Sequence, residues 1–328
     1  MTLDLPVVFA VLMGAAILAY VVLDGYDLGV GMLMAGAGRE EQDVMVSSIG
    51  PFWDANQTWL VLGVGLLLAA FPAAHGLILG ALYLPVAAML TGIVLRGVAF
   101  ELRIKAEGWH RELWNWLFWA GSTLASFAQG LMLGRYITGF EPGIGYWLFA
   151  VLVGAALCGG YVLLGAGWLI LRTEGALQAK ARGWARWGLA WIALGVALVS
   201  LGTPFVSETV RSRWFDFPRT LGLMLLPLMT ALTWVWIWVS LGRSEWKPFA
   251  GAVAIYVLAF FGLAYSLFPY VVIDRMTIWE AAAHPSALVF VLVGTLIVLP
   301  FIVGYTVYAY RVFRGKARAG AYGHGKYT

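Results

Sequence analysis

The chain has 328 residues, of which 62% are hydrophobic and only 12% are charged. Soluble domains are typically about 45–50% apolar and about 25% charged, so a soluble globular protein is excluded. The 21 Lys and Arg residues exceed the 17 Asp and Glu residues, but they lie between apolar runs, which argues against nucleic-acid binding. A single cysteine, Cys158, excludes an intramolecular disulfide and a cysteine-based metal cluster.

Nine apolar segments are long enough to cross a bilayer, since about 20 apolar residues span a hydrocarbon core roughly 30 Å thick. The runs are continuous rather than alternating, which favours helices over a β-barrel. The first run lacks a basic N-terminal region, so it predicts a span and not a cleaved signal peptide. We therefore predict an all-α polytopic membrane protein with transmembrane helices at 6–34, 55–72, 76–100, 113–137, 145–171, 185–203, 219–241, 249–269 and 286–310.

The basic residues predict the orientation of the chain, because cytoplasmic loops carry an excess of Lys and Arg. Fifteen of the 21 Lys and Arg residues fall on one side of the predicted spans, and Arg96 lies inside a span. The richer side carries the C-terminus, so we predict a cytoplasmic C-terminus and an N-terminus outside. The five basic residues of the outer side are Arg135, Arg211, Arg213, Arg219 and Arg275.

The first span ends in a polar segment, Leu-Asp-Gly-Tyr-Asp-Leu-Gly-Val-Gly-Met at 23–32. Asp24 and Asp27 are three residues apart and therefore share one face of a helix. Charged groups inside a bilayer are costly, so they mark function or pairing. Gly25 and Gly29 form a small-xxx-small pattern, which predicts the close approach of another helix.

The second span opens with Ser-Ile-Gly-Pro-Phe-Trp-Asp-Ala-Asn-Gln at 48–57. Asp54 follows Pro51 and could simply cap the helix, since its carboxylate can accept backbone N–H bonds. Capping does not explain why further polar residues continue into the membrane boundary. A hydrated access for protons or for a quinone headgroup would explain them. These further residues are Asn56, Gln57 and Thr58.

The third span ends with Leu-Arg-Gly-Val-Ala-Phe-Glu at 95–101. Arg96 lies too deep to reach the interface by extending its side chain, so we expect it to pair with a carboxylate. Asp24 and Asp54 are the candidate partners, because all three residues lie at the same membrane level. A purely structural ion pair is the alternative to a functional one. Glu101 lies toward the same cytoplasmic side.

Other polar residues give weaker signals. Gln129, Arg135 and Glu141 flank the outer end of the fourth span and are expected at the interface. The basic segment 311–328 predicts a short disordered tail near anionic headgroups. No histidine is expected in the core of a span, so the chain offers no axial haem ligand of that kind. His75, His110 and His284 are all expected in loops.

The three polar segments, their spacing and the nine spans resemble subunit II of the cytochrome bd-type quinol oxidases over essentially the whole chain. The first two motifs are specific to this family, whereas the last third of the chain supports the resemblance mainly by its hydropathy. The short length and compact loops resemble the cyanide-insensitive branch. The resemblance implies a single transmembrane domain over 1–328, built as two four-helix bundles plus one peripheral helix. The expected division is roughly 1–140 for the first bundle, 141–310 for the second bundle and peripheral helix, and 311–328 for the tail.

The resemblance also implies partners and cofactors. The chain would assemble with a subunit I that carries haems b and d, often with a small single-span subunit, in the bacterial cytoplasmic (inner) membrane. The complex would oxidise quinol and reduce oxygen to water with protons from the cytoplasm. This chain would hold no haem and would act as scaffold and proton route, with room for a structural quinone.

The resemblance carries over to particular residues. Asp24 and Asp54 match carboxylates of a proton route, and Asp27 lies on the same helical face as Asp24. Trp53 and Arg96 match motif positions near that route. Glu101 stands where some members have Asp, which keeps the charge. The predicted pathway residues are therefore Asp24, Asp27 and Asp54, with Trp53, Asn56, Arg96 and Glu101 as lining or ion-pair residues.

Two other classes of protein are compatible with buried charges or with an apolar chain. A proton-coupled secondary transporter also uses buried Asp and Arg residues, but its polar breaks usually occur in both halves. Here the polar residues concentrate in the first third of the chain. A purely structural membrane anchor would leave Asp24 and Arg96 unexplained.

Overall fold

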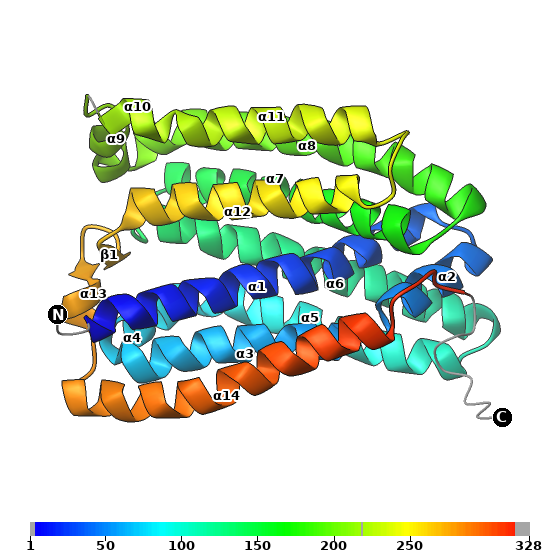
Figure 1. Cartoon of the computed structure of the whole chain (residues 1–328), viewed down its shortest axis with the longest axis horizontal. Helices are drawn as coiled ribbons and strands as arrows, with labels where there is room; N and C mark the ends of the chain where they lie inside the picture. Colours follow the sequence, from blue (N-terminus) through cyan, green and yellow to red (C-terminus); the bar gives the residue numbers. More distant parts are fainter. Residues whose placement is uncertain (1–3, 218, 319–328) are drawn as a thin grey trace.

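The computed structural model of the chain describes residues 4–217 and 219–318. Its long helices lie side by side along the longest axis of the molecule (Figure 1). They are α1 (Leu5–Leu33), α3 (Trp53–Ala70), α5 (Tyr83–Lys105), α6 (Gly108–Ile137), α7 (Ile144–Arg172), α8 (Gly175–Val206), α11 (Leu225–Ser240), α12 (Lys247–Leu267) and α14 (Pro285–Val312). The short elements are η1 (Met34–Gly36), α2 (Arg39–Ile49), α4 (Pro72–Ala81), α9 (Glu208–Trp214), α10 (Arg219–Leu223), β1 (Tyr270–Val272), β2 (Met276–Thr277) and α13 (Ile278–Ala281).

Each predicted span falls on a long helix, with two corrections that proline explains. The span predicted at 76–100 is wrong at its start, because α4 ends at Ala81 and α5 begins only at Tyr83. Pro85 has no N–H to donate to the carbonyl four residues before it, which interrupts the helix there. The span predicted at 219–241 is divided in the same way between α10 and α11, just before Pro227.

The helices are apolar enough for a membrane protein. Within the described residues, six helices are long and apolar enough to cross a bilayer by length and composition. Helices α3, α6 and α11 do not meet that criterion, although each coincides with a predicted span. The all-α membrane fold is therefore supported, whereas the count of nine spans stays a prediction. The six helices are α1, α5, α7, α8, α12 and α14.

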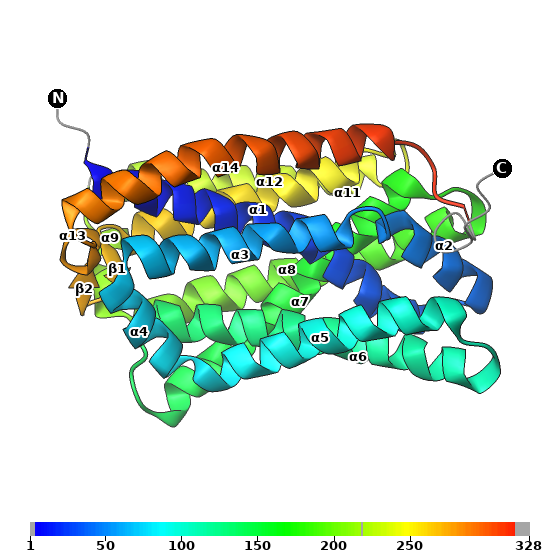
Figure 2. The ribbon, with the colours of Figure 1, turned by 90° about the horizontal axis from the view of Figure 1, so that it is seen from below.

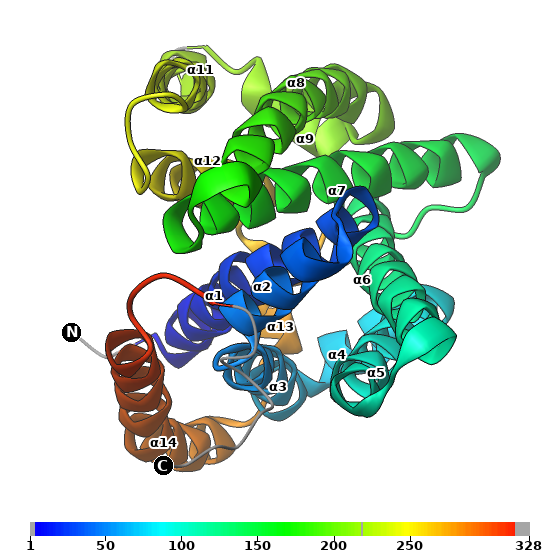
Figure 3. The ribbon, with the colours of Figure 1, turned by 90° about the vertical axis from the view of Figure 1, so that its right-hand side faces the viewer.

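Helix α1 lies at the centre of the molecule and contacts α3, α6 and α7 (Figure 3). The predicted close approach of another helix at Gly25 and Gly29 is confirmed, and the other helix is α7. A Cβ at Gly29 would lie 1.8 Å from the Tyr161 carbonyl oxygen. On the α7 side, a Cβ at Gly165 would lie 2.4 Å from the backbone of Gly29. The two backbones can touch only because both positions lack a side chain.

The remaining long helices pack in neighbouring pairs, α5 with α6, α7 with α8 and α11 with α12. Seen end-on, α14 lies at the edge of the molecule and runs beside α3 (Figure 3). The division into two four-helix bundles plus one peripheral helix, with boundaries near residues 140 and 310, stays a prediction.

The short elements gather at the two ends of the long helices. Helices α4 and α13 and the antiparallel pair of β1 and β2 lie at the end where α1 begins (Figure 2). Helix α2 lies at the other end, where α14 finishes. This second end is the one predicted to face the cytoplasm.

The segment after α14 corrects part of the predicted disordered tail. The backbone N–H of Ala317 donates to the Arg172 carbonyl at 2.7 Å, and Lys316 Nζ donates to the Thr173 carbonyl at 3.0 Å. These bonds satisfy carbonyls at the C-terminal end of α7, which a helix end leaves without intrahelical partners. The start of the tail is therefore held against α7, and the rest, with His324, lies outside the described residues.

Candidate functional site

A buried ion pair between α1 and α5 lies at the centre of the candidate site. Arg96 Nη2 donates to Asp24 Oδ1 at 2.6 Å, and the two side chains are 1% and 0% exposed. Arg96 lies one turn after the point where α5 touches α6. At that point a Cβ on either Gly92 or Gly121 would lie 2.7 Å from the carbonyl oxygen of the other. Of the two carboxylates considered for Arg96, the structure therefore pairs it with Asp24.

Asp27 lies one turn further along α1 and is held by α3. Its side chain is fully buried, and Asn56 Nδ2 donates to Asp27 Oδ2 at 2.7 Å. The same nitrogen lies 3.0 Å from the Tyr26 hydroxyl. The Tyr26 and Tyr310 hydroxyls are 2.6 Å apart, and the Tyr310 hydroxyl donates to Asn56 Oδ1 at 3.2 Å. Asn56 thus links a buried carboxylate to two tyrosine hydroxyls, one of them on α14.

A second polar chain leads from α1 toward α7. Tyr20 lies one turn before Asp24, and Gln129 Nε2 donates to the Tyr20 hydroxyl at 2.8 Å. The Tyr161 hydroxyl in turn donates to Gln129 Oε1 at 2.6 Å. Gln129, which was expected at the membrane interface, has a side chain that is 8% exposed and joins α1, α6 and α7.

Several buried polar atoms of the site form no hydrogen bond with another described residue. They surround the ion pair on α1, α5 and α6. A buried polar group without a partner costs about 1–3 kcal/mol, so we expect water molecules to satisfy them. With two carboxylates and one guanidinium, the cluster can also hold a proton in addition to the ion pair. The atoms are Asp24 Oδ2, Asp27 Oδ1, Arg96 Nε and Nη1, and Ser122 Oγ.

Asp54 and Glu101 lie outside this cluster. Asp54 is exposed on the first turn of α3 and makes no hydrogen bond or ion pair with another described residue. The N-cap of α3 is Phe52, so the possibility that Asp54 caps the helix through a side-chain bond is not realised. Trp53 is buried and packs on Phe100, with ring centroids 4.9 Å apart. Glu101 is exposed on the surface of α5.

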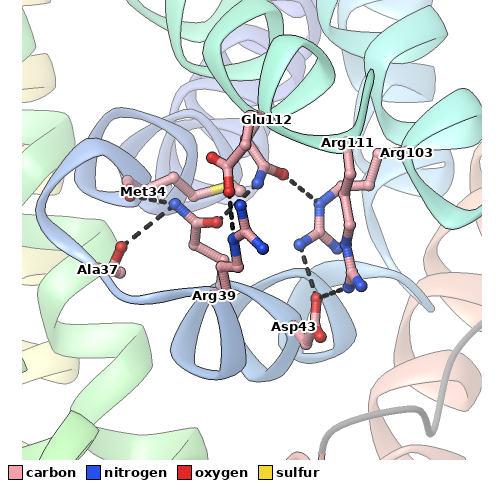
Figure 4. A network of polar contacts seen from close by, with 9 residues as sticks. Met34, Ala37, Arg39, Asp43, Arg103, Arg111 and Glu112 are labelled. Atoms are coloured by element: carbon pink, nitrogen blue, oxygen red, sulfur yellow. Dashed lines mark hydrogen bonds and ion pairs between the residues drawn. The ribbon is translucent and has the colours of Figure 1, made fainter. Parts of the chain in front are cut away.

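A second charged network holds α2 against the ends of α5 and α6 (Figure 4). Arg103 Nη2 donates to Asp43 Oδ1 at 2.7 Å, and Arg111 donates to the same oxygen. Arg103 Nε also donates to Asn115 Oδ1 at 2.6 Å, and Asn115 Nδ2 donates to Gln42 Oε1 at 2.7 Å. This network covers the end of the molecule nearest the ion pair, and sequence analysis assigned none of its contacts.

Helix α2 is also tied to α8 on its other side. Lys180 Nζ donates to Glu41 Oε2 at 2.6 Å, and this hydrogen bond lowers the pKa of the Glu41 carboxyl below its ordinary value. The backbone N–H of Gly38 donates to the same oxygen at 2.8 Å. Partly exposed pairs of this kind contribute about 0–1 kcal/mol each.

The tyrosines and the glutamine of the site were not identified from sequence. One signal was present, because Tyr20 and Asp24 are four residues apart and share a helical face. Nothing in the sequence places Tyr161, Gln129 or Tyr310 beside the aspartates, since they belong to helices distant along the chain.

The structure also corrects the placement of the histidines. His75 lies within α4 and His110 in the first turn of α6, whereas both were expected in loops. His284 is the N-cap of α14. Among the described residues no histidine is buried, so the described interior offers no imidazole to a haem iron.

Known proteins similar to this chain align with nearly its whole length. The family model of cytochrome bd terminal oxidase subunit II matches residues 5–313. Cytochrome bd ubiquinol oxidase subunit 2 of Bacillus subtilis (strain 168) is 28% identical over 326 residues, which cover 93% of this chain and 94% of that protein. Cytochrome bd-I ubiquinol oxidase subunit 2 of Escherichia coli (strain K12) is 27% identical over 355 residues, covering 91% of each chain.

The fold is similar to that of a chain in the structure of bd oxidase from Geobacillus thermodenitrificans. The TM-score is 0.77 and the identity 14%, over 95% of this chain and 99% of that chain. At this identity the likeness shows the fold, and the family assignment follows from the family model. The chain therefore belongs to the cytochrome bd terminal oxidase subunit II family, whose members are integral membrane subunits of a terminal oxidase complex.

Proposed function

We propose that this chain is the haem-free subunit II of a bd-type terminal oxidase that oxidises quinol and reduces oxygen to water. The names of the relatives support a quinol substrate, since the Bacillus and Escherichia proteins are both subunits of a ubiquinol oxidase. Haems b and d belong to subunit I in this proposal, and no step of the reaction is assigned to a haem in this chain. A small single-span subunit and a structural quinone remain expectations of the family resemblance.

We propose further that the chain serves as scaffold for subunit I and as a route for protons from the cytoplasm. The observation that carries this proposal is the buried cluster of Asp24, Asp27 and Arg96, in which one oxygen of each carboxylate has no hydrogen-bond partner among the described residues. Buried ionisable groups in a membrane protein are costly and are retained for pairing or for transport of charge. Asp54 is exposed two residues before Asn56, which suits a position at the mouth of the route.

A proton-coupled transporter is not favoured. The family model describes an oxidase subunit and matches 5–313. The buried charged residues in the described part of the chain also lie in only three helices, α1, α5 and α6. A transporter with alternating access would usually carry polar sites in both repeats.

The proton route predicts that single carboxamide substitutions slow oxygen reduction. Asp27→Asn keeps the shape and still accepts a hydrogen bond from Asn56, but it removes the titratable oxygen. We expect Asp24→Asn and Asp27→Asn to lower quinol oxidase turnover per haem by about tenfold or more, because positioned proton-transfer groups contribute factors of this size or larger. We expect a smaller loss of turnover for Asp54→Asn. Asp54 is exposed, so water can deliver protons to the route without this carboxylate.

The measurement is oxygen consumption with quinol in membranes, divided by the haem content of the same membranes. Glu107→Gln is the matched control, because Glu107 is an exposed carboxylate in the connection between α5 and α6. Turnover per haem at the control level in both Asp24→Asn and Asp27→Asn would leave only a structural role for the cluster.

We propose that the protein lies in the bacterial cytoplasmic membrane with its N-terminus outside and its C-terminus in the cytoplasm. The excess of basic residues on the C-terminal side supports this orientation. The start of α1 and the finish of α14 also lie at opposite ends of the molecule. A fluorescent protein fused after Thr328 should be bright, and alkaline phosphatase fused there should be inactive. Active phosphatase with a dark fluorescent fusion would reverse the orientation.

A further inference from the structure

A ring of three hydrogen-bonded side chains connects α14 with the buried Asp27. Asn56 Nδ2 donates to the Tyr26 hydroxyl at 3.0 Å, the Tyr26 and Tyr310 hydroxyls are 2.6 Å apart, and the Tyr310 hydroxyl donates to Asn56 Oδ1 at 3.2 Å. Either of the two tyrosine hydroxyls can be the donor of the bond between them. The ring is closed, and the two tyrosines can exchange donor and acceptor roles by rotation of their hydroxyls, whereas the Asn56 amide nitrogen only donates and its amide oxygen only accepts.

The same tyrosine borders a surface pocket. Tyr310, Arg311, Thr306, Val307 and Leu23 line a pocket of about 340 Å³ between α14 and α1. This volume is large enough for several water molecules. The pocket lies near the C-terminal end of α14, which finishes at Val312, at the same end of the molecule as α2. That end is the one proposed to face the cytoplasm, so water and protons are available there.

The distance from the ring to Asp27 is short. The Tyr26 hydroxyl and Asp27 Oδ2 both lie within 3.0 Å of the same nitrogen, Asn56 Nδ2. One water molecule can bridge two oxygens held that close to a common donor. Asp27 Oδ1 is buried and has no partner among the described residues, so it is available to accept from such a water.

We propose, resting on the proposed proton route, that protons reach Asp27 from this pocket through the hydroxyls of Tyr310 and Tyr26. The Tyr310 oxygen takes a proton from a hydronium ion in the pocket, which leaves a neutral water molecule, as its own proton passes to the Tyr26 oxygen. The Tyr26 proton passes in turn to a bridging water, and a proton of that water binds Asp27. Both tyrosines end neutral, no electrons move, and one proton has been transferred from the pocket to the carboxylate.

Tyr310 connects the surface to the buried cluster more directly than Asp54 does, so the pocket is a second entry to the proposed route. Asp54 is exposed on the same first turn of α3 as Asn56 and makes no hydrogen bond to the described residues of the cluster. Tyr310, by contrast, both lines the pocket and bonds two members of the buried network. The path therefore makes α14 part of the uptake route.

The test replaces each tyrosine with phenylalanine, which removes only the hydroxyl group. In Tyr310→Phe the ring still stacks on Phe52, with centroids 4.5 Å apart in the native protein, so assembly should persist. We expect turnover per haem and the rate of proton uptake, followed with a pH indicator in the purified complex, to fall about two- to tenfold, the size of one lost hydrogen bond. The matched control is Tyr308→Phe, because Tyr308 is 65% exposed on the same helix.

A second variant tests whether the two hydroxyls act in one path. Tyr26→Phe should slow proton uptake to a similar degree, and the double variant Tyr26→Phe/Tyr310→Phe should be no slower than the slower single one. Groups in series are non-additive in this way, whereas independent sites add. Additive losses in the double variant would overturn the relay.

The outcomes separate this proposal from the proton route itself. If Tyr310→Phe matches Tyr308→Phe in proton uptake while Asp27→Asn is slow, protons enter elsewhere and the relay is overturned. If Asp27→Asn is also normal, the route through the cluster fails as well. If Tyr310→Phe lowers the haem content but not the turnover per haem, Tyr310 is structural, which also overturns the relay.

Discussion

Replacing Arg96 with leucine is expected to prevent assembly of most of the complex. The change removes the cation that pairs with Asp24 at 2.6 Å and leaves two fully buried carboxylates, Asp24 and Asp27, in the interior. Breaking a buried ion pair by removing one partner typically costs about 3–5 kcal/mol, a large part of the stability of a protein. The measurements are the haem content of membranes and the melting temperature of the detergent-solubilised complex.

Two further variants make this result interpretable. Arg39→Ala removes a guanidinium that is 71% exposed and paired with Glu112, so it should cost about 1 kcal/mol or less. The double variant Asp24→Leu/Arg96→Leu removes both charges of the pair, and replacement of a buried pair by apolar residues is often close to neutral. We expect the double variant to recover haem content while turnover per haem stays low. Normal assembly of Arg96→Leu alone would mean that the pair contributes little to the fold.

Gly29→Ala is the second substitution with a large expected effect. The added Cβ would lie 1.8 Å from the Tyr161 carbonyl oxygen, and that oxygen belongs to backbone that a side-chain rotation cannot move. Helix α1 would have to separate from α7 along the contact that holds the centre of the molecule. Overpacking typically costs about 1–3 kcal/mol and sometimes more, and we expect the upper end here.

The measurement is the yield of monodisperse protein after solubilisation in mild detergent. Gly65→Ala introduces the same methyl group into α3, where it would meet nothing within 4 Å. Alanine has the higher helix propensity by about 1 kcal/mol, so the control should be as stable as the native protein or more stable. Equal yields from the two variants would show that α1 and α7 can move apart at little cost.

Much of this architecture follows from local properties of the chain. Continuous apolar runs predict membrane helices, because only a helix satisfies its own backbone hydrogen bonds within one segment of lipid-exposed chain. A charge placed deep in such a run predicts a buried partner, which holds for Arg96. The spacing of Gly25 and Gly29 predicts a close helix contact, which α7 provides. These inferences depend on periodicity and on the cost of burying charge, and both are encoded within a single helix.

Other features of the site depend on which helices become neighbours. Asp24 and Asp54 were equal candidates for Arg96, and the packing of α1 against α3, α6 and α7 buries Asp24, whereas Asp54 stays exposed on α3. Gln129 lies near the end of an apolar run in the sequence, yet contact with α1 and α7 buries its side chain. Hydropathy along one segment contains no information about such contacts.

The hydrogen bond between the residues farthest apart in the sequence shows most clearly that hydropathy does not predict the partners of buried polar groups. Tyr310 and Asn56 are 254 residues apart, and their hydrogen bond exists because α14 returns to lie beside α3. Local pattern therefore predicts that the helices form and that their charges are buried. The identity of each polar partner is set by the packing of distant helices, since a hydrogen bond requires atoms about 3 Å apart whatever their separation in sequence.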